Sequence, residues 1–421
     1  MSEPAWQDSP VALRTAAQIF LSFAFAYFFS ALLRAVTATL APAFSQELGL
    51  GAGDLGLLAG AYFFGFAAMQ LPLGSALDRY GPKRVLVTFM TVAVLACAAF
   101  AMARGFAALL LARMLIGVGV AACLMAPLTS FRHRFSPALQ LRANSWMLMT
   151  GSLGMLASTV PVQALLPLIG WRGLFWLLAA LLALAIAGIV LLVPRDAPAH
   201  GVAPQAAPHG GYREIFGHPM FLRLLPMGFF HYGGLVAMQS LWAGPWLTEV
   251  AGHAPHDAAR GLFLINLSML FAFLSWGLCM PRLMRRGWDA LRLIRVGVPL
   301  SLVTLAAVVA LGERSAAPAW ALWCVSCTFV TLAQPAVGQA FDRTRAGRAL
   351  SAYNLVIFAG VFCVQWGIGL LIDALQAWGW ARVPSFQAAF AVFAVACAAS
   401  YLWFLRHGTV SPRCTRADVA S

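Results

Sequence analysis

The sequence predicts an all-α membrane protein with twelve transmembrane helices arranged as two six-helix halves, and three observations support this prediction. First, 61% of the 421 residues are hydrophobic and only 10% are charged, whereas soluble domains carry about 25% charged residues. Second, apolar runs long enough to cross about 30 Å of hydrocarbon recur along the whole chain. Third, a segment rich in Pro, His and Gly at 195–218 divides these runs into two equal sets.

The twelve predicted spans fall into two halves, 15–194 and 219–405. The N-terminal half holds spans at 15–45, 52–77, 83–103, 106–130, 142–168 and 172–194, and the C-terminal half holds spans at 219–248, 258–281, 290–311, 317–341, 349–374 and 383–405. Residues 1–14 and 406–421 are expected to be tails, and 195–218 a linker. Helices inside a bundle can carry polar faces, so the spans need not be uniformly apolar.

Basic residues are distributed unevenly between the predicted loops. Of the 28 Lys and Arg residues, 21 lie in the tails, the linker and the loops on the same side, five lie in the opposite loops, and Arg34 and Arg113 lie inside spans. Because cytoplasmic loops carry an excess of Lys and Arg, we expect a multi-pass inner-membrane protein with both termini in the cytoplasm. The net charge of +14 is thereby explained without a nucleic-acid partner.

The loop after the second predicted span carries a sequence motif. It reads GSALDRYGPKR from Gly74 to Arg84 and matches the pattern G-x-x-x-D-R-x-G-x-[KR]-[KR] in full. It resembles the signature loop of the major facilitator superfamily, and a second resemblance lies in the fourth span, Arg113-x-x-x-Gly117-x-Gly119-x-Ala121. The resemblance covers the whole chain and implies a secondary transporter that works by alternating access between two repeats.

The resemblance also implies a cytoplasmic gate. Asp78 would interact with the positive N-terminal end of the eleventh span when this gate is closed, with Arg345 and Arg348 as candidate charge partners. Gly74 would allow close helix approach, and Gly81 a tight turn. The alternative is a basic loop that only sets the topology. The expected gating residues are Gly74, Asp78, Arg79, Gly81, Lys83, Arg84, Arg345 and Arg348.

Ionisable residues inside the membrane are costly, which makes Arg34, Arg113 and His231 candidates for function. Arginine presents a planar fork suited to a carboxylate or phosphate. We therefore expect Arg34 to bind an anionic substrate; the alternative is a structural strut paired with Glu47 or with backbone carbonyls. For Arg113 the structural alternative is the stronger one. His231 is the mid-span group that titrates nearest neutral pH, so it is the candidate proton carrier if transport is coupled to protons.

Polar or aromatic stripes at helical spacing run along the first, seventh and tenth spans, where lipid contact would be unfavourable. These stripes predict a shared interior path, with interhelical packing as the alternative. The expected substrate-binding residues are Tyr27, Ser30, Arg34, Arg113, His231, Met238, Gln239, Trp242, Thr331 and Gln339.

The leading functional hypothesis is a secondary transporter, such as a symporter, for a small anionic organic solute. Two alternatives remain open: efflux of amphipathic compounds, and import of a soft metal such as copper. The Gly-Pro motif of drug/proton antiporters is missing from the fifth span, which reads Gly151-Ser-Leu-Gly154 and so disfavours efflux. We expect no enzyme activity, no cofactor and no resident metal. The expected partners are a small-molecule substrate and the lipid bilayer, with a functional monomer.

Overall fold

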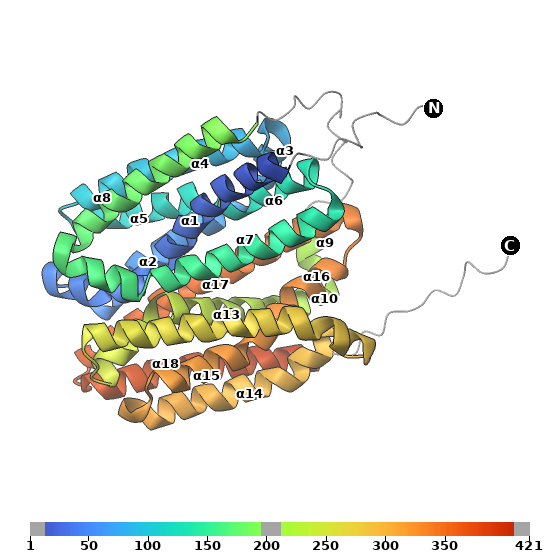
Figure 1. The fold of residues 1–421 in the computed structure, drawn as a ribbon. Helices are drawn as coiled ribbons and strands as arrows, with labels where there is room; N and C mark the ends of the chain where they lie inside the picture. The colour runs from blue at the N-terminus through green and yellow to red at the C-terminus, as the bar shows by residue number, and fades with distance from the viewer. Residues whose placement is uncertain (1–12, 195–211, 408–421) are drawn as a thin grey trace, which may run out of the picture.

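The computed structural model describes residues 13–194 and 212–407, which form helices and the turns that join them. Figure 1 shows two groups of helices side by side, the blue-to-green helices of the N-terminal half and the yellow-to-red helices of the C-terminal half, except that α17 lies along the seam between them. The predictions made for 1–12, 195–211 and 408–421 lie outside the described residues.

Helices in the N-terminal half follow the predicted spans closely. They are α1 (Leu13–Leu48), α2 (Ala52–Ala68), α3 (Gln70–Tyr80), α4 (Pro82–Met102), α5 (Phe106–Val120), α6 (Ala122–Arg134), α7 (Pro137–Ala157) and α8 (Val160–Leu192). The second span is bent by 45° between α2 and α3. The turn predicted at Gly81 is confirmed, since its φ of 81° is followed by Pro82 at the first position of α4, where a missing N–H is tolerated.

The C-terminal half begins with a short helix that precedes the seventh span. Its helices are α9 (Tyr212–Gly217), α10 (Pro219–Pro226), α11 (Gly233–Ala237), α12 (Ala243–Pro245), α13 (Pro255–Arg285), α14 (Ala290–Leu311), α15 (Ala317–Cys327), α16 (Ala333–Gln339), α17 (Arg343–Ala377) and α18 (Arg382–Arg406). The seventh span runs from α10 to the π-helical segment Trp246–Val250, with two further π-helical segments, Met227–Tyr232 and Met238–Trp242, between its α-helical parts. A short 3₁₀ segment, Thr328–Leu332, joins α15 to α16.

The predicted all-α membrane fold is confirmed, although the number of spans is not reproduced exactly. Among the described residues, 10 helical stretches are long and apolar enough to cross a membrane, or 11 when the bent pair of α2 and α3 is counted as one span. The fifth predicted span, 142–168, is divided between α7 and α8. The fifth and sixth predicted spans meet inside α8 at Gly170, whose φ of 64° interrupts the helix.

Apolar side chains cover the outside of the bundle. Leu191 is 80% exposed, Val395 68% and Leu95 66%, although side chains of this kind are the ones that soluble proteins bury most often. Exposure of this extent agrees with a multi-pass membrane protein, in which the outer faces of the helices are apolar.

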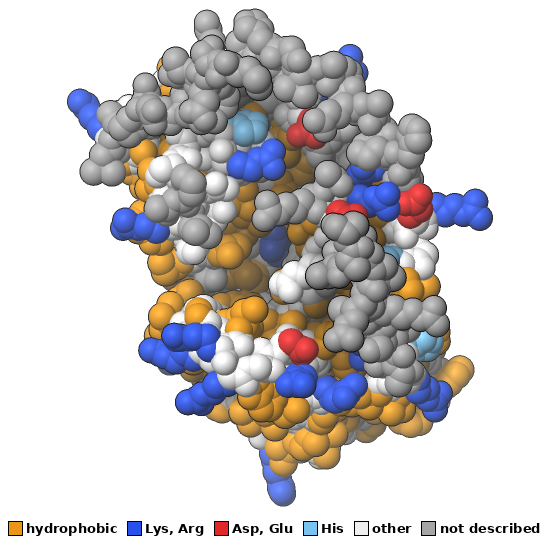
Figure 2. Space-filling model, turned by 90° about the vertical axis from the view of Figure 1, so that its right-hand side faces the viewer, with side chains coloured by type: hydrophobic (Ala, Val, Ile, Leu, Met, Phe, Trp, Pro, Cys, Tyr) orange, Lys and Arg blue, Asp and Glu red, His pale blue; other side chains and the backbone are white. Residues whose placement is uncertain are grey.

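The two ends of the bundle differ in charge and in closure. We call the end where α1 begins and α3 ends the basic end, since it carries Arg14, Arg79, Arg84 and Arg406, and we call the other end the opposite end. Figure 2, which looks onto the basic end, shows Lys and Arg side chains around a hollow between the halves, with a further basic side chain deep inside it.

At the opposite end the two halves are in direct backbone contact. A Cβ atom on Gly56 of α2 would lie 2.4 Å from the carbonyl oxygen of Gln365 on α17, and one on Gly369 would lie 2.3 Å from that of Ala52. Only glycine allows backbones to approach this closely. The opposite end is therefore closed, while the hollow opens at the basic end.

Candidate functional site

Arg34 lies on α1 among side chains from both halves. Its guanidinium interacts electrostatically with the phenol groups of Tyr27 on α1 and Tyr62 on α2, and its Cζ atom lies 5.6 Å from the ring centroid of Phe66. Tyr232, from the seventh span, interacts electrostatically with Arg34 from the C-terminal half. We refer to these five residues as the Arg34 cluster.

The charge of Arg34 has no carboxylate partner among the described residues. The groups that interact with it are tyrosines and the ring of Phe66, and its Nε atom is buried without a hydrogen-bond partner. A buried donor that lacks an acceptor costs about 1–3 kcal/mol, and more when it is charged. The cluster therefore holds a cation with spare hydrogen-bonding capacity at a position where both halves meet.

Arg113 supports the Arg34 cluster from α5. It is 1% exposed, and its Nη2 atom donates to the carbonyl oxygen of Leu33 at 3.0 Å and to Oγ1 of Thr37 at 2.5 Å. Its Cζ atom lies 5.0 Å from the ring centroid of Tyr62, so Tyr62 contacts both arginines. These bonds tie α5 to α1, which is the structural role weighed for Arg113; direct contact with substrate stays a prediction.

Gly117, one helical turn after Arg113, brings α5 against α2. A Cβ atom there would lie 1.9 Å from the carbonyl oxygen of Tyr62. The motif in the fourth span thus fixes the backbone that carries Tyr62.

His231 lies beside Tyr232 in sequence but points elsewhere. Its Nε2 atom lies 2.9 Å from Oγ of Ser301 on α14. That hydroxyl donates to the carbonyl oxygen of Val298, which leaves Nε2 as the donor to Ser301. The Nδ1 atom is buried without a partner. The structure does not bring His231 into the Arg34 cluster, and its role as a proton carrier stays a prediction.

Two other predicted residues of the seventh span bond to neighbouring helices of the C-terminal half, and a third is buried. Gln239 donates to Oδ1 of Asn266 on α13 at 2.8 Å, and Trp242 donates to the carbonyl oxygen of Gln365 at 3.1 Å. Met238 is fully buried. The structure therefore shows these residues in packing contacts, outside the Arg34 cluster.

The remaining predicted residues lie on α1 and around the tenth span. The carbonyl oxygen of Ser30 accepts a bond from Tyr62 at 3.4 Å, so Ser30 adjoins the cluster. Thr331 is half-buried and donates to the carbonyl oxygen of Thr328. Gln339 is exposed at the end of α16.

Tyr62, Phe66 and Tyr232 were not predicted as site residues. Tyr62 and Phe66 are four residues apart on α2, so they share one face of that helix. Tyrosine is scarce in the chain, with 7 in 421 residues, and three of the seven meet at Arg34. That scarcity is the signal that could have pointed to them.

The predicted gate residues of the signature loop lie at the basic end. Asp78 is exposed, and a Cβ atom on Gly74 would meet no atom within 4 Å, so the close approach predicted at Gly74 is absent from this structure. Lys83 donates to the carbonyl oxygens of Val190 at 2.9 Å and Val193 at 2.5 Å, which satisfies the end of α8.

The start of α17, the expected partner of Asp78, is covered by α9. Arg345 forms an ion pair with Glu214 of α9 at 2.9 Å. Both residues and Arg348 line a cavity of about 260 Å³ beside α9. The remaining basic residues of the loop, Arg79 and Arg84, are exposed.

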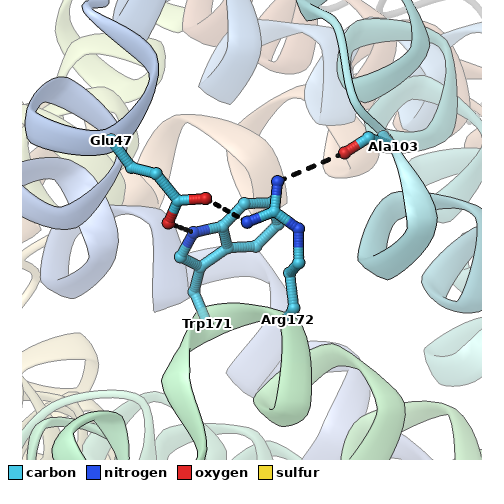
Figure 3. Close-up of polar contacts among 4 residues, drawn as sticks. All are labelled: Glu47, Ala103, Trp171 and Arg172. Atoms are coloured by element: carbon cyan, nitrogen blue, oxygen red, sulfur yellow. Dashed lines mark hydrogen bonds and ion pairs between the residues drawn. The ribbon is translucent and has the colours of Figure 1, made fainter.

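Glu47 at the opposite end does not pair with Arg34. Figure 3 shows its carboxylate between Trp171 and Arg172. The carboxylate accepts a hydrogen bond from Nε1 of Trp171 at 2.5 Å and forms an ion pair with Arg172. Arg172 also donates a hydrogen bond to the carbonyl oxygen of Ala103. The alternative in which Glu47 neutralises Arg34 is therefore wrong, because Glu47 serves to hold the end of α1 against α8.

Comparison with known proteins settles the family. A model of the Major Facilitator Superfamily matches residues 23–331. The chain belongs to the major facilitator superfamily. The resemblance seen in the sequence is thereby confirmed, and the relatives and solved structures that the chain matches are named as transporters.

Curated relatives in the superfamily share moderate identity over part of the chain. A probable sulfoacetate transporter of Cupriavidus necator is 27% identical over 37% of this chain and 36% of its own length. The multidrug resistance protein MdtM of Salmonella typhimurium is 27% identical over 42% of this chain and 43% of its own length. The 4-hydroxybenzoate transporter PcaK of Pseudomonas aeruginosa is 33% identical over 36% of this chain and 34% of its own length. These matches thus span well under half of each relative.

Solved structures of the superfamily share the fold. A bacterial homologue of the human lysosomal transporter Spinster, in an inward-facing and unoccupied conformation, matches with a TM-score of 0.76 at 16% identity, over 94% of this chain and 98% of that one. The likeness confirms the superfamily fold.

Proposed function

We propose that this superfamily member moves a small organic anion, a carboxylate or a sulfonate, across the inner membrane by alternating access, with Arg34 as the anion-binding group. The observation that carries the proposal is the Arg34 cluster, in which a half-buried guanidinium has tyrosine neighbours and a buried, unpartnered Nε atom but no carboxylate partner among the described residues.

Electrostatics favours an anion at this position. A charge inside the membrane is expensive unless it is paired or faces a water-filled cavity. The phenol groups beside Arg34 are uncharged and do not neutralise it, whereas a bound anion would neutralise the charge and accept its hydrogen bonds. Arginine binds carboxylates with two parallel N–H···O bonds, which adds orientation to charge.

The relatives support the chemical class. Two of them are named for sulfoacetate and 4-hydroxybenzoate, a sulfonated acid and a carboxylate. Both compounds are anions at neutral pH, as the proposal requires.

We infer that the basic end faces the cytoplasm, because Lys and Arg concentrate in cytoplasmic loops. In that orientation the structure, hollow at the basic end and closed at the opposite end, is the state open to the cytoplasm. Thiol labelling of single cysteines placed at Ser136 and at Gln46, in a cysteine-free variant in intact cells, tests this orientation. A membrane-impermeant reagent should label only the variant at Gln46. Labelling of the variant at Ser136 instead would show that the basic end faces away from the cytoplasm.

Binding of anions by the purified protein tests the proposed function. We expect a panel of organic carboxylates and sulfonates to include compounds that raise the thermal unfolding temperature, and we expect Arg34→Ala to abolish that rise. Arg104→Ala is the matched control, because Arg104 is exposed and should leave the rise intact. Retention of the rise in Arg34→Ala would overturn the proposal.

Proton coupling with His231 as carrier forms part of the proposal. His231 is buried and its Nδ1 atom is available to accept a proton. We also propose a functional monomer, since one chain supplies every member of the Arg34 cluster.

Efflux of amphipathic compounds is the second candidate, favoured by the similarity to MdtM. It predicts that uncharged or cationic amphipathic compounds stabilise the protein equally in the wild type and in Arg34→Ala. Stabilisation limited to anions would exclude it.

A further inference from the structure

We infer that the anion is an aromatic carboxylate rather than a sugar acid. The inference rests on the proposed function, because it assumes that Arg34 binds the charged group. The observations that carry it are the rings around Arg34 and the pairing of the amide side chains of the interior.

Aromatic rings from both halves adjoin Arg34. Phe66 of the cluster meets Phe358 of α17 edge-to-face, with 4.6 Å between ring centroids. Phe63 stacks on Phe358 at 6.1 Å, and Tyr62 stacks on Phe66 at 6.2 Å. Together with Tyr232, these rings form what we call the aromatic wall, which extends from Arg34 in the N-terminal half to rings of the C-terminal half.

Two of these rings remain partly exposed. Tyr232 and Phe358 are half-buried, as is Arg34, whereas Tyr62, Phe63 and Phe66 are buried. The partly exposed groups are therefore Arg34 and two rings of the aromatic wall, Tyr232 and Phe358, both from the C-terminal half. A ligand that bonds to Arg34 through its carboxylate would find flat apolar faces for the rest of its body.

Recognition of a sugar acid would need several free amide or carboxylate groups for its hydroxyls. Three interior amides already donate to a neighbouring side chain, although the oxygens of Gln365 and Asn144 are buried without a partner. Gln334 donates to Asn354 at 2.6 Å, and Gln365 donates to Ser240 at 2.9 Å. Gln239 is likewise bonded to Asn266.

Breaking these pairs to bind hydroxyl groups would leave buried polar groups unsatisfied, at a cost of about 1–3 kcal/mol each. Offset or edge-to-face contact with a ligand ring needs no such exchange. The wall therefore favours a planar aromatic body over a polyhydroxylated one.

Three probes of similar size and one sugar acid separate the features of the ligand. Benzoate has a ring and a charge, cyclohexanecarboxylate has the charge and apolar bulk without a π face, benzamide has the ring without the charge, and gluconate has the charge with hydroxyls. We expect affinities measured by titration calorimetry to be highest for benzoate, lower for cyclohexanecarboxylate, and undetectable for benzamide and gluconate.

Phe358→Leu removes the ring contributed by the C-terminal half while keeping an apolar side chain. Aromatic pairs contribute about 0.5–1.5 kcal/mol beyond their area, so we expect benzoate to bind about 2- to 12-fold more weakly, with cyclohexanecarboxylate unchanged. Phe393→Leu is the matched control, because Phe393 lies in the C-terminal half against Trp323 and should alter neither affinity.

The outcomes separate this inference from the function on which it rests. Binding of gluconate but not benzoate, abolished by Arg34→Ala, would overturn the aromatic class and keep the anion site. Equal loss of both carboxylates in Phe358→Leu would also overturn it, since the ring would then act only in packing. Failure of all anions to bind in an Arg34-dependent manner would overturn the proposed function itself.

Discussion

Asp373 on α17 caps the first turn of α2 across the boundary between the two halves. One of its carboxylate oxygens accepts a bond from the backbone N–H of Gly53 at 2.7 Å, and the other accepts from the N–H of Ala52 at 3.1 Å. The first N–H groups of a helix have no partner within the helix, and its N-terminal end favours negative charge. Because the bond joins the halves, it must break before the opposite end can open.

We predict that Asp373→Asn shifts the protein toward the state open at the opposite end. Hydrogen bonds to a charged group contribute about 1.5–3 kcal/mol, which corresponds to a population change of roughly 10- to 100-fold. Spin labels at Gln46 and Gln376, exposed positions of the two halves at this end, should report a larger share of long distances.

Asp257→Asn is the control for that prediction, because Asp257 at the same end pairs only with the exposed Arg260. Gly53→Ala should act like Asp373→Asn, since its Cβ atom would lie 2.7 Å from the carboxylate of Asp373. Unchanged distance distributions in both variants would show that the cap does not hold this end closed.

We predict that Thr37→Val destabilises the protein by about 1–3 kcal/mol, because it removes an acceptor from the buried guanidinium of Arg113. The measurement is unfolding in detergent, followed by a thiol-reactive dye that reports exposure of the buried cysteines. Thr91→Val should leave stability unchanged, since Thr91 is exposed and bonds only within α4. Equal stability of the two variants would count against Arg113 as a strut.

Gly117→Ala should lower stability by about 3 kcal/mol, because the added atom would overlap the backbone of Tyr62 and overpacking of a rigid core is costly. Gly188→Ala is the matched variant on α8, where a Cβ atom would meet nothing within 4 Å. That variant should be neutral or slightly stabilising, as expected for alanine in a helix. Similar unfolding temperatures for the two would refute the close contact of α5 with α2.

His231→Gln tests proton coupling. Glutamine can keep a bond to Ser301 through its amide, but it cannot take up a proton, so we expect uptake into proteoliposomes to lose its dependence on pH. Ser301→Ala removes the bond while keeping the histidine, and it should retain the pH dependence. An unchanged pH profile in His231→Gln would remove His231 as the carrier.

The membrane fold followed from sequence because its signals are local. Apolar runs of sufficient length, the loop from Gly74 to Arg84 and the bias of Lys and Arg between loops each depend on neighbouring residues only. The boundary at Gly170 also fell where the fifth and sixth runs meet. The kink after α2 and the division of the fifth run between α7 and α8 were not predicted, since bends depend on packing against other helices.

For the candidate site, sequence alone selected Arg34, since a charge within an apolar run is conspicuous whatever surrounds it. It did not select Tyr62, Tyr232 or Phe358, because aromatic side chains on three separate helices look like ordinary packing until the helices are placed together. Nor did it decide between partners: Glu47 binds Arg172, and His231 binds Ser301. Those choices depend on the rotation of each helix about its axis, which is set by long-range contacts such as Gly117 against Tyr62 and not by the periodicity of any one span.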